Sequence, residues 1–272
     1  MNRHLILISN PGNPNANNYV PETDMAIERW KFFFQSPIGG YWRDDEICCY
    51  DEHHPISSDE FRRIMMVLDT AQCDYSVVVF CGHGCATSDL RDAIQLPIPT
   101  VGNDNLFPVN DLLGINGAIV RRTLILDACR SIVPFTSQQL FEQRQYSEVF
   151  NIDGIECVKY YNSLIMESNP HVEILQSTNL HNRAYGSTTG SVYADTVMSY
   201  VNRNTIYWKN SALLDRYGKF SFSMEQLQNA VIQNMAHLDN QTPEYKNSIP
   251  QSASFPFAAM HLPNEFITKM RL

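Results

Sequence analysis

Two apolar runs of the chain end in side chains that suit acyl transfer. One run ends in Asp127 and Cys129, and the other is followed by His83, which stands between two glycines and precedes the cysteine by 46 positions. A thiol attacks a carbonyl carbon as the thiolate, so a catalytic cysteine needs a nearby imidazole to accept its proton. These residue types predict a Cys129–His83 dyad, provided that the fold brings the two together.

The elements that must position this pair alternate between apolar runs and helical patterns. The middle runs are apolar on both faces, which is typical of strands covered by helices on both sides. A capping-box pair, Ser57 and Glu60, opens one helical pattern. The sequence therefore predicts an α/β fold with a mainly parallel sheet. The expected strands are 4–9, 46–50, 75–82, 123–128, 172–177 and 255–260, and the expected helices include 21–34, 57–72 and 153–168.

A parallel sheet would place the candidate residues at one edge. Reactive groups of open parallel sheets gather beyond the carboxyl ends of the strands. There the backbone N–H groups of Gly84 and Cys129 are expected to face the oxyanion of a tetrahedral intermediate. A lone histidine after a strand, or a lone cysteine on one, is more often structural. Finding both at matching strand ends favours catalysis by His83 and Cys129.

Composition narrows the function classes. The chain has 272 residues, 20 basic and 29 acidic side chains and a net charge of −9, with no Lys or Arg run longer than a pair. This pattern disfavours a nucleic-acid partner. The first apolar run meets Pro11 too soon for a signal sequence or a membrane span, so we expect a cytoplasmic protein with no membrane partner. Seven scattered cysteines imply no disulfide framework.

The two strand ends carry a family resemblance. The strand–His–Gly pattern at 77–84, followed by strand–Asp–Ala–Cys–Arg–Ser at 127–131, resembles the caspase-like cysteine peptidases, particularly their bacterial members, metacaspases and paracaspases. Further similarity covers 18–47, 172–178, 190–201 and the closing segment 241–260. The resemblance implies a three-layer α/β/α sandwich with a mainly parallel six-stranded sheet.

The resemblance also implies the organisation of the chain. One peptidase domain over 1–272 would comprise a large-subunit-like half at 1–132, a connecting segment at 133–152 and a small-subunit-like half at 153–272. Arg144, in the polar connecting segment, is either a self-cleavage point or a solvated helix residue.

Asp127 admits two interpretations. It is either a structural acid paired with an arginine (Arg121, Arg122 or Arg130), or it lines the pocket that holds the side chain before the scissile bond. In metacaspases and paracaspases this acid, with the aspartate of the first helix, binds Arg or Lys, and Asp127 and Asp24 stand at those positions. Animal caspases, which cut after Asp, have Gln in place of Asp127. The resemblance therefore predicts cleavage after Arg or Lys.

One departure affects this pocket. Paracaspases add a glutamate shortly after the fifth strand, where this chain has "RAYG" at 183–186 and no acid. An Arg183 facing the pocket would partly cancel its negative charge.

Metals and cofactors are not expected. Cys81, His83 and Cys85 form C-x-H-x-C, but no second paired-ligand motif accompanies it. The acidic runs 43–46 and 51–54 suit calcium, which some metacaspases require, although such loops are usually only solvated. Cysteine peptidase chemistry needs no cofactor.

The expected partners are a protein or peptide substrate with a basic residue at the cleavage site and a separate activator protein. Bacterial relatives act in defence, antiviral defence included, or in regulated cell death. The alternative from another class is a catalytically silent caspase-fold binding or scaffold module, which the presence of both His83 and Cys129 disfavours.

Overall fold

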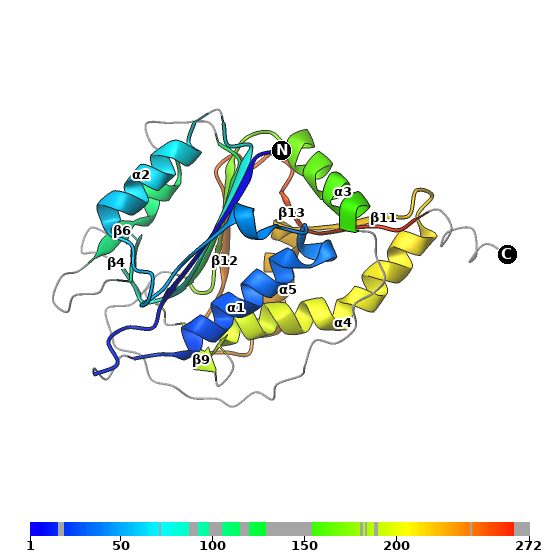
Figure 1. The fold of residues 1–272 in the computed structure, drawn as a ribbon. Helices are drawn as coiled ribbons and strands as arrows, with labels where there is room; N and C mark the ends of the chain where they lie inside the picture. Colours follow the sequence, from blue (N-terminus) through cyan, green and yellow to red (C-terminus); the bar gives the residue numbers. More distant parts are fainter. Residues whose placement is uncertain are drawn as a thin grey trace.

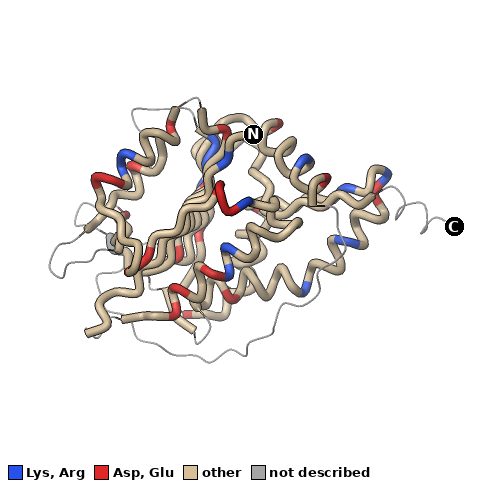
Figure 2. Tube along the Cα trace, viewed as in Figure 1, with Lys and Arg blue, Asp and Glu red and all other residues tan. Residues whose placement is uncertain are grey.

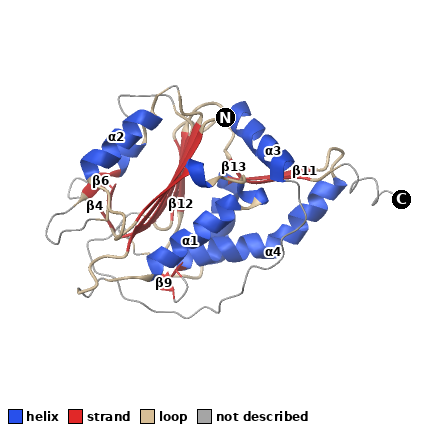
Figure 3. Cartoon of the chain, in the orientation of Figure 1, coloured by secondary structure: helices blue, strands red, loops and turns tan. Residues whose placement is uncertain are grey.

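A six-stranded sheet separates two helical layers (Figures 1 and 3). The computed structural model describes residues 1–15, 19–70, 72–86, 92–97, 105–114, 120–128, 154–179, 182, 184–187, 190–239 and 241–263. The strand order is β12-β8-β7-β3-β1-β2, in which β12 alone is antiparallel to its neighbour. The strands of this sheet are β1 (Arg3–Asn10), β2 (Ile47–Tyr50), β3 (Tyr75–Gly82), β7 (Arg122–Ala128), β8 (Val172–Gln176) and β12 (Glu244–Asn247).

Alternate residues of the central strands supply two separate cores. Val77 and Val79 of β3 face one layer, whereas Val78 and Phe80 face the other, as the period of two along a strand requires. The strands β3, β7 and β8 are buried along their whole length. The predicted mainly parallel sheet, with strands covered on both faces, is therefore confirmed.

In the described part of the chain, the larger layer contains four helices and a two-stranded sheet, and the smaller contains one helix and a three-stranded sheet. The elements of the larger layer are α1 (Glu22–Gln35), α3 (Gly154–Glu167), α4 (Val192–Leu214), α5 (Met224–Met235), β11 (Lys219–Ser223) and β13 (Pro256–His261). Those of the smaller layer are α2 (Ser58–Leu68), β4 (Gly84–Ala86), β5 (Asp92–Gln95), β6 (Leu106–Pro108) and the 3₁₀ turn η3 (Val109–Leu112). Two short strands, β9 (Gly186–Ser187) and β10 (Gly190–Ser191), precede α4, and the 3₁₀ turns η1 (Pro37–Gly39) and η2 (Asp44–Glu46) follow α1.

One expected strand of the large sheet lies elsewhere. The apolar run at 255–260 is a strand, β13, but it pairs with β11 in a separate two-stranded sheet. The sixth strand of the large sheet is β12, which pairs with β8. Because β12 has the polar sequence "EYKN", as suits an edge strand, it lacks the apolar signal that marked the buried strands.

Capping residues stand in the sequence at the starts of helices α2 and α5. The Ser57 hydroxyl accepts a hydrogen bond from the N–H of Glu60 at the start of α2, as predicted. Helix α5 was not among the predicted elements, although Ser223 and Gln226 form a capping box at its start.

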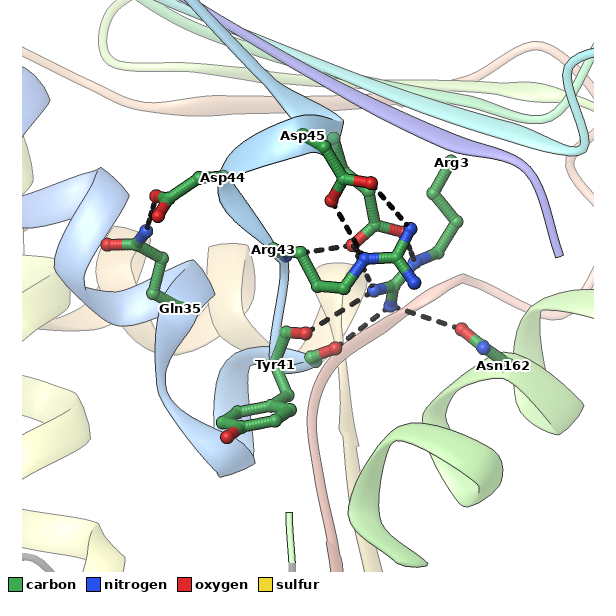
Figure 4. A network of polar contacts seen from close by, with 9 residues as sticks. Arg3, Gln35, Tyr41, Arg43, Asp44, Asp45 and Asn162 are labelled. Atoms are coloured by element: carbon green, nitrogen blue, oxygen red, sulfur yellow. Dashed lines mark hydrogen bonds and ion pairs between the residues drawn. The ribbon is translucent and has the colours of Figure 1, made fainter. Parts of the chain in front are cut away.

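A buried ion-pair network fixes the start of β1 (Figure 4). The guanidinium of Arg3 donates to both carboxylate oxygens of Glu46, at 3.0 and 2.9 Å, and to Asn162 of α3 at 3.1 Å. Burial opposes ionisation of Glu46, but hydrogen bonds from Arg3 and from the N–H of Arg43 lower the pKa of this carboxyl. Asp45 pairs with Arg43 at 2.8 Å. These acids of the 43–46 run therefore have protein partners.

Charge is distributed unevenly along the larger layer. Figure 2 shows acidic residues gathered where α1 and α4 begin, whereas basic residues follow the other end of α4. Glu22 and Asp24 lie in the first turn of α1, and Asp195 lies in that of α4. No helix among the described residues is long and apolar enough to cross a membrane.

Candidate functional site

Three neighbouring strands present one row of polar side chains near their carboxyl ends. Parallel pairing aligns Ser9 of β1 with Cys81 of β3, and Cys81 with Asp127 of β7. The next row along the strands is Asn10, Gly82 and Ala128. Leu126 and Ala128 belong to the core of the smaller layer, so the alternation turns Asp127 toward the layer of α1 and α4.

Gly82 lets the chain leave β3 directly beside β1. Its φ is +152°, and a Cβ there would lie 2.5 Å from the carbonyl oxygen of Asn10. Only glycine fits this position without a shift of the backbone. The following residue, His83, is half-buried, and its Nε2 lies 3.4 Å from the carbonyl oxygen of Pro11. Gly84 then begins β4.

A small pocket, partly open to solvent, lies at this edge of the sheet. Its walls come from β3, β7, α1 and the β9–β10 hairpin. The residues lining it are Val20, Thr23, Cys81, Gly82, His83, Asp127, Ala184, Tyr185, Gly186, Gly190 and Ser191. The structure therefore brings His83 and Asp127, two of the residues predicted from sequence, into one pocket.

Asp127 is the buried acid of the pocket. Its side chain is 3% exposed, and its Oδ2 accepts a hydrogen bond from the hydroxyl of Ser191. Oδ1 is buried without a hydrogen-bond partner among the described residues. Burial raises the pKa of Asp127 to about 6, the Ser191 and Ser177 hydroxyls oppose this shift, and the nearby charge of Asp195 adds to it. The carboxyl therefore has a pKa closer to neutral pH than an exposed aspartate, and one of its buried oxygens has no hydrogen-bond partner among the described residues.

The interpretation of Asp127 as an acid paired with Arg121, Arg122 or Arg130 finds no support in the two of these arginines that are described. Arg122 donates to Asp69 at 2.7 Å and to Ser76 at 2.9 Å, and Arg121 donates to the carbonyl oxygen of Ser168. Arg130 lies outside the described residues. The described contacts of Asp127 therefore favour its interpretation as a pocket residue.

Asp24 lies beside the pocket. The Ser9 hydroxyl donates to Asp24. The Oγ of Ser9 also lies 3.0 Å from the hydroxyl oxygen of Thr23, and Thr23 lines the pocket. The charges of Asp127 and Asp24 add to burial in raising the pKa of the Cys81 thiol well above its ordinary value. Both acids thus act on the same buried part of the site.

Sequence reasoning missed Asp195. No acid occurs at 183–186, but Asp195 in the first turn of α4 accepts a hydrogen bond from Ser187 of β9 and pairs with Arg29 of α1. Its only sequence signal is an acid four residues after Ser191, which is ordinary for the first turn of a helix. The proximity of Asp195 to Asp127 arises from tertiary packing.

Three more of the residues named from the sequence lie outside the described part of the chain. Cys129 follows Ala128 directly in the sequence but lies outside the described residues, as do Arg144 and Arg183. Within the described ranges, no three His, Cys, Asp or Glu side chains lie close enough together to hold a metal ion.

Comparisons with known proteins identify the fold. No protein-family model matches the chain, and no curated protein sequence does. The crystal structure of caspase-1 from Spodoptera frugiperda is similar, with a TM-score of 0.51 and 12% identity over 93% of this chain and 89% of that one. A crystal structure of a protein from Geobacter sulfurreducens has a TM-score of 0.51 and 12% identity over 91% of this chain and 93% of that one. The chain therefore has a caspase-like fold.

Proposed function

We propose that the protein is a cysteine endopeptidase that cleaves protein substrates after Arg or Lys. The observation that carries this proposal is the pocket in which His83 lies beside a buried carboxyl, Asp127, whose Oδ1 has no described partner. Pairing of Gly82 with Ala128 supports the dyad, because the chain continues from these paired residues into His83 and Cys129.

The proposed reaction is acyl transfer to a thiol. The Cys129 thiolate attacks the peptide carbonyl carbon, and the N–H groups of Gly84 and Cys129 stabilise the resulting oxyanion. Protonated His83 gives its proton to the leaving amine as the C–N bond breaks, and this leaves a thioester. His83 then takes a proton from water, which attacks the thioester and releases the new carboxyl terminus together with the thiol.

The proposed specificity rests on the charge of the pocket. An ionised carboxyl in a narrow, buried site is strongly disfavoured unless a cation pairs with it. A substrate Arg or Lys would supply that cation to Asp127, and Asp24 would add a second negative charge nearby. A substrate Asp would bring a like charge to the same place and be rejected.

Fluorogenic peptides test this proposal. We expect release of the fluorophore after Arg or Lys to be at least about 100-fold faster than after Asp, because a like-charge juxtaposition in a buried site costs several kcal/mol. A Cys129→Ala variant should release none. Release after Asp, or release that survives Cys129→Ala, would contradict the proposal.

The rival function is a non-catalytic binding or scaffold module. An arginine-containing, thiol-reactive peptide probe separates the two: covalent labelling at Cys129 supports the peptidase, whereas reversible binding without labelling supports the module. The proposed biological setting is bacterial defence or regulated cell death in the cytoplasm, with a separate protein as activator.

A further inference from the structure

Two elements of the pocket wall, α1 and β9, meet helix α4 at one carboxylate. Asp195 of α4 pairs with Arg29 of α1 through Oδ1 and accepts a hydrogen bond from Ser187 of β9 through Oδ2. The Asp195 and Arg29 side chains are 13% and 20% exposed, so water screens this pair much less than an exposed one. Both carboxylate oxygens of Asp195 are therefore used to join separate elements.

Strand β10 also approaches α1 closely at a glycine. Gly190 of β10 has a φ of +142°, and a Cβ there would lie 3.2–3.3 Å from Ala26 of α1. The hairpin thus rests on the backbone of α1 one turn before Arg29. Gly186, Gly190 and Ser191 of this wall line the pocket.

Backbone contact alone leaves the wall weakly held. Among the described residues, β9 and β10 pair through two residues each, and one more backbone hydrogen bond, from the N–H of Val192 to the carbonyl oxygen of Tyr185, follows at 2.9 Å. A two-stranded ribbon this short does not hold its position without packing or side-chain bonds. The bonds from Asp195 supply that support, because they reach β9 on one side and α1 on the other.

We propose that Asp195 is a positioning residue for substrate recognition: with Arg29 and Ser187 it holds the β9–β10 wall against α1 and so keeps the pocket closed around a cationic side chain. The effect on substrates rests on the proposed function. The effect on the wall does not.

Hydrogen exchange tests the wall directly. Asp195→Ala and Arg29→Met each remove one side of the ion pair, and the second variant keeps the apolar stem of the arginine. The matched control is Asp111→Ala, which breaks the ion pair between α2 and η3 in the smaller layer. We expect amide exchange in peptides covering 184–191 to be about tenfold faster in both test variants and unchanged in the control.

A guanidinium probe tests the pocket without turnover. We expect calorimetry to show that agmatine binds the parent protein and binds both test variants about 10-fold or more weakly, since a misplacement of about 1 Å costs up to about 100-fold. For cleavage of Arg peptides, we expect the loss to appear in KM, with kcat changed less than about threefold, because the proposed dyad residues follow β3 and β7 in the chain and do not belong to the β9–β10 wall.

The outcomes separate the two claims. Faster exchange in both test variants together with weaker agmatine binding supports the inference. If exchange is faster in both test variants but the parent protein neither binds agmatine nor cleaves a peptide, the positioning role is supported and the proposed function is rejected. Unchanged exchange at 184–191 in both variants overturns the inference.

Discussion

The burial of Asp127 makes its ionised form unfavourable. Ionisation of this buried carboxyl destabilises the folded protein, and the hydrogen bond from the Ser191 hydroxyl offsets only part of that destabilisation. A purely structural acid would gain from a positively charged partner, yet neither Arg121 nor Arg122 provides one. Protein sites that trade stability for function commonly contain such groups.

Asp127→Asn is expected to stabilise the protein while removing the proposed preference for basic residues. The folded pKa of about 6 lies above the unfolded value, so stability falls as the pH rises from about 4 to 6 and the penalty is fully present above that range. Asparagine does not ionise. The free energy of unfolding at pH 8 should therefore rise by about 1–3 kcal/mol, and the gain should vanish near pH 4.

Denaturant unfolding at both pH values measures this effect, with Arg-peptide cleavage measured in parallel. A variant less stable than the parent at pH 8 would identify Asp127 as a structural acid instead.

At the scale of elements, two helices begin with the same cap but differ in what the cap touches. Ser57 accepts from the N–H of Glu60 at the start of α2, and Ser191 accepts from the N–H of Ala194 at the start of α4. Only Ser191 also donates to Asp127. The Ser191 side chain thus both caps the start of α4 and donates a hydrogen bond to the acid of the pocket.

Ser191→Ala and Ser57→Ala form a matched pair. Each should lower the free energy of unfolding by about 1 kcal/mol through loss of the cap. Only Ser191→Ala removes a donor from Asp127, so only this variant should raise the pKa of that carboxyl further. The acidic limb of the pH profile of kcat/KM for Arg peptides should therefore move above pH 6 in Ser191→Ala and stay in place in Ser57→Ala. If the acidic limb of the kcat/KM profile has the same midpoint pH in both variants, Ser191 does not lower the pKa of Asp127.

At the scale of the whole molecule, the two sides of the connecting segment share one sheet and one core. Strand β7 precedes the segment and β8 follows it, and they pair over five residue pairs from Arg122–Val172 to Leu126–Gln176. The larger core joins residues from before the segment, such as Trp30 and Val79, to residues from after it, such as Trp208 and Val231. Neither part has this core to itself.

A chain cut once after Arg144 is therefore expected to stay assembled. The two fragments should elute together from a size-exclusion column in native buffer and separate in denaturant. The reason is that the apolar surface buried between them stabilises their association even when the peptide bond that joins them is cut. An uncut chain run under both conditions is the control. Separation in native buffer would show that the segment holds the halves together.

Local information in the sequence determined the α/β class, five of the six described strands of the large sheet, the starts of α1, α2 and α3, and the positions of His83 and Asp127 at strand ends. These follow from apolar periodicity and caps, which depend on near neighbours in the chain. Tertiary structure alone decided that the run at 255–260 pairs with β11, that Ser191 reaches Asp127, and that Asp195 joins Arg29 to Ser187. The physical reason is the same in each case: these partners are chosen by the packing of α1, α4 and the sheet, and spacing along the chain does not encode which distant side chains that packing brings together.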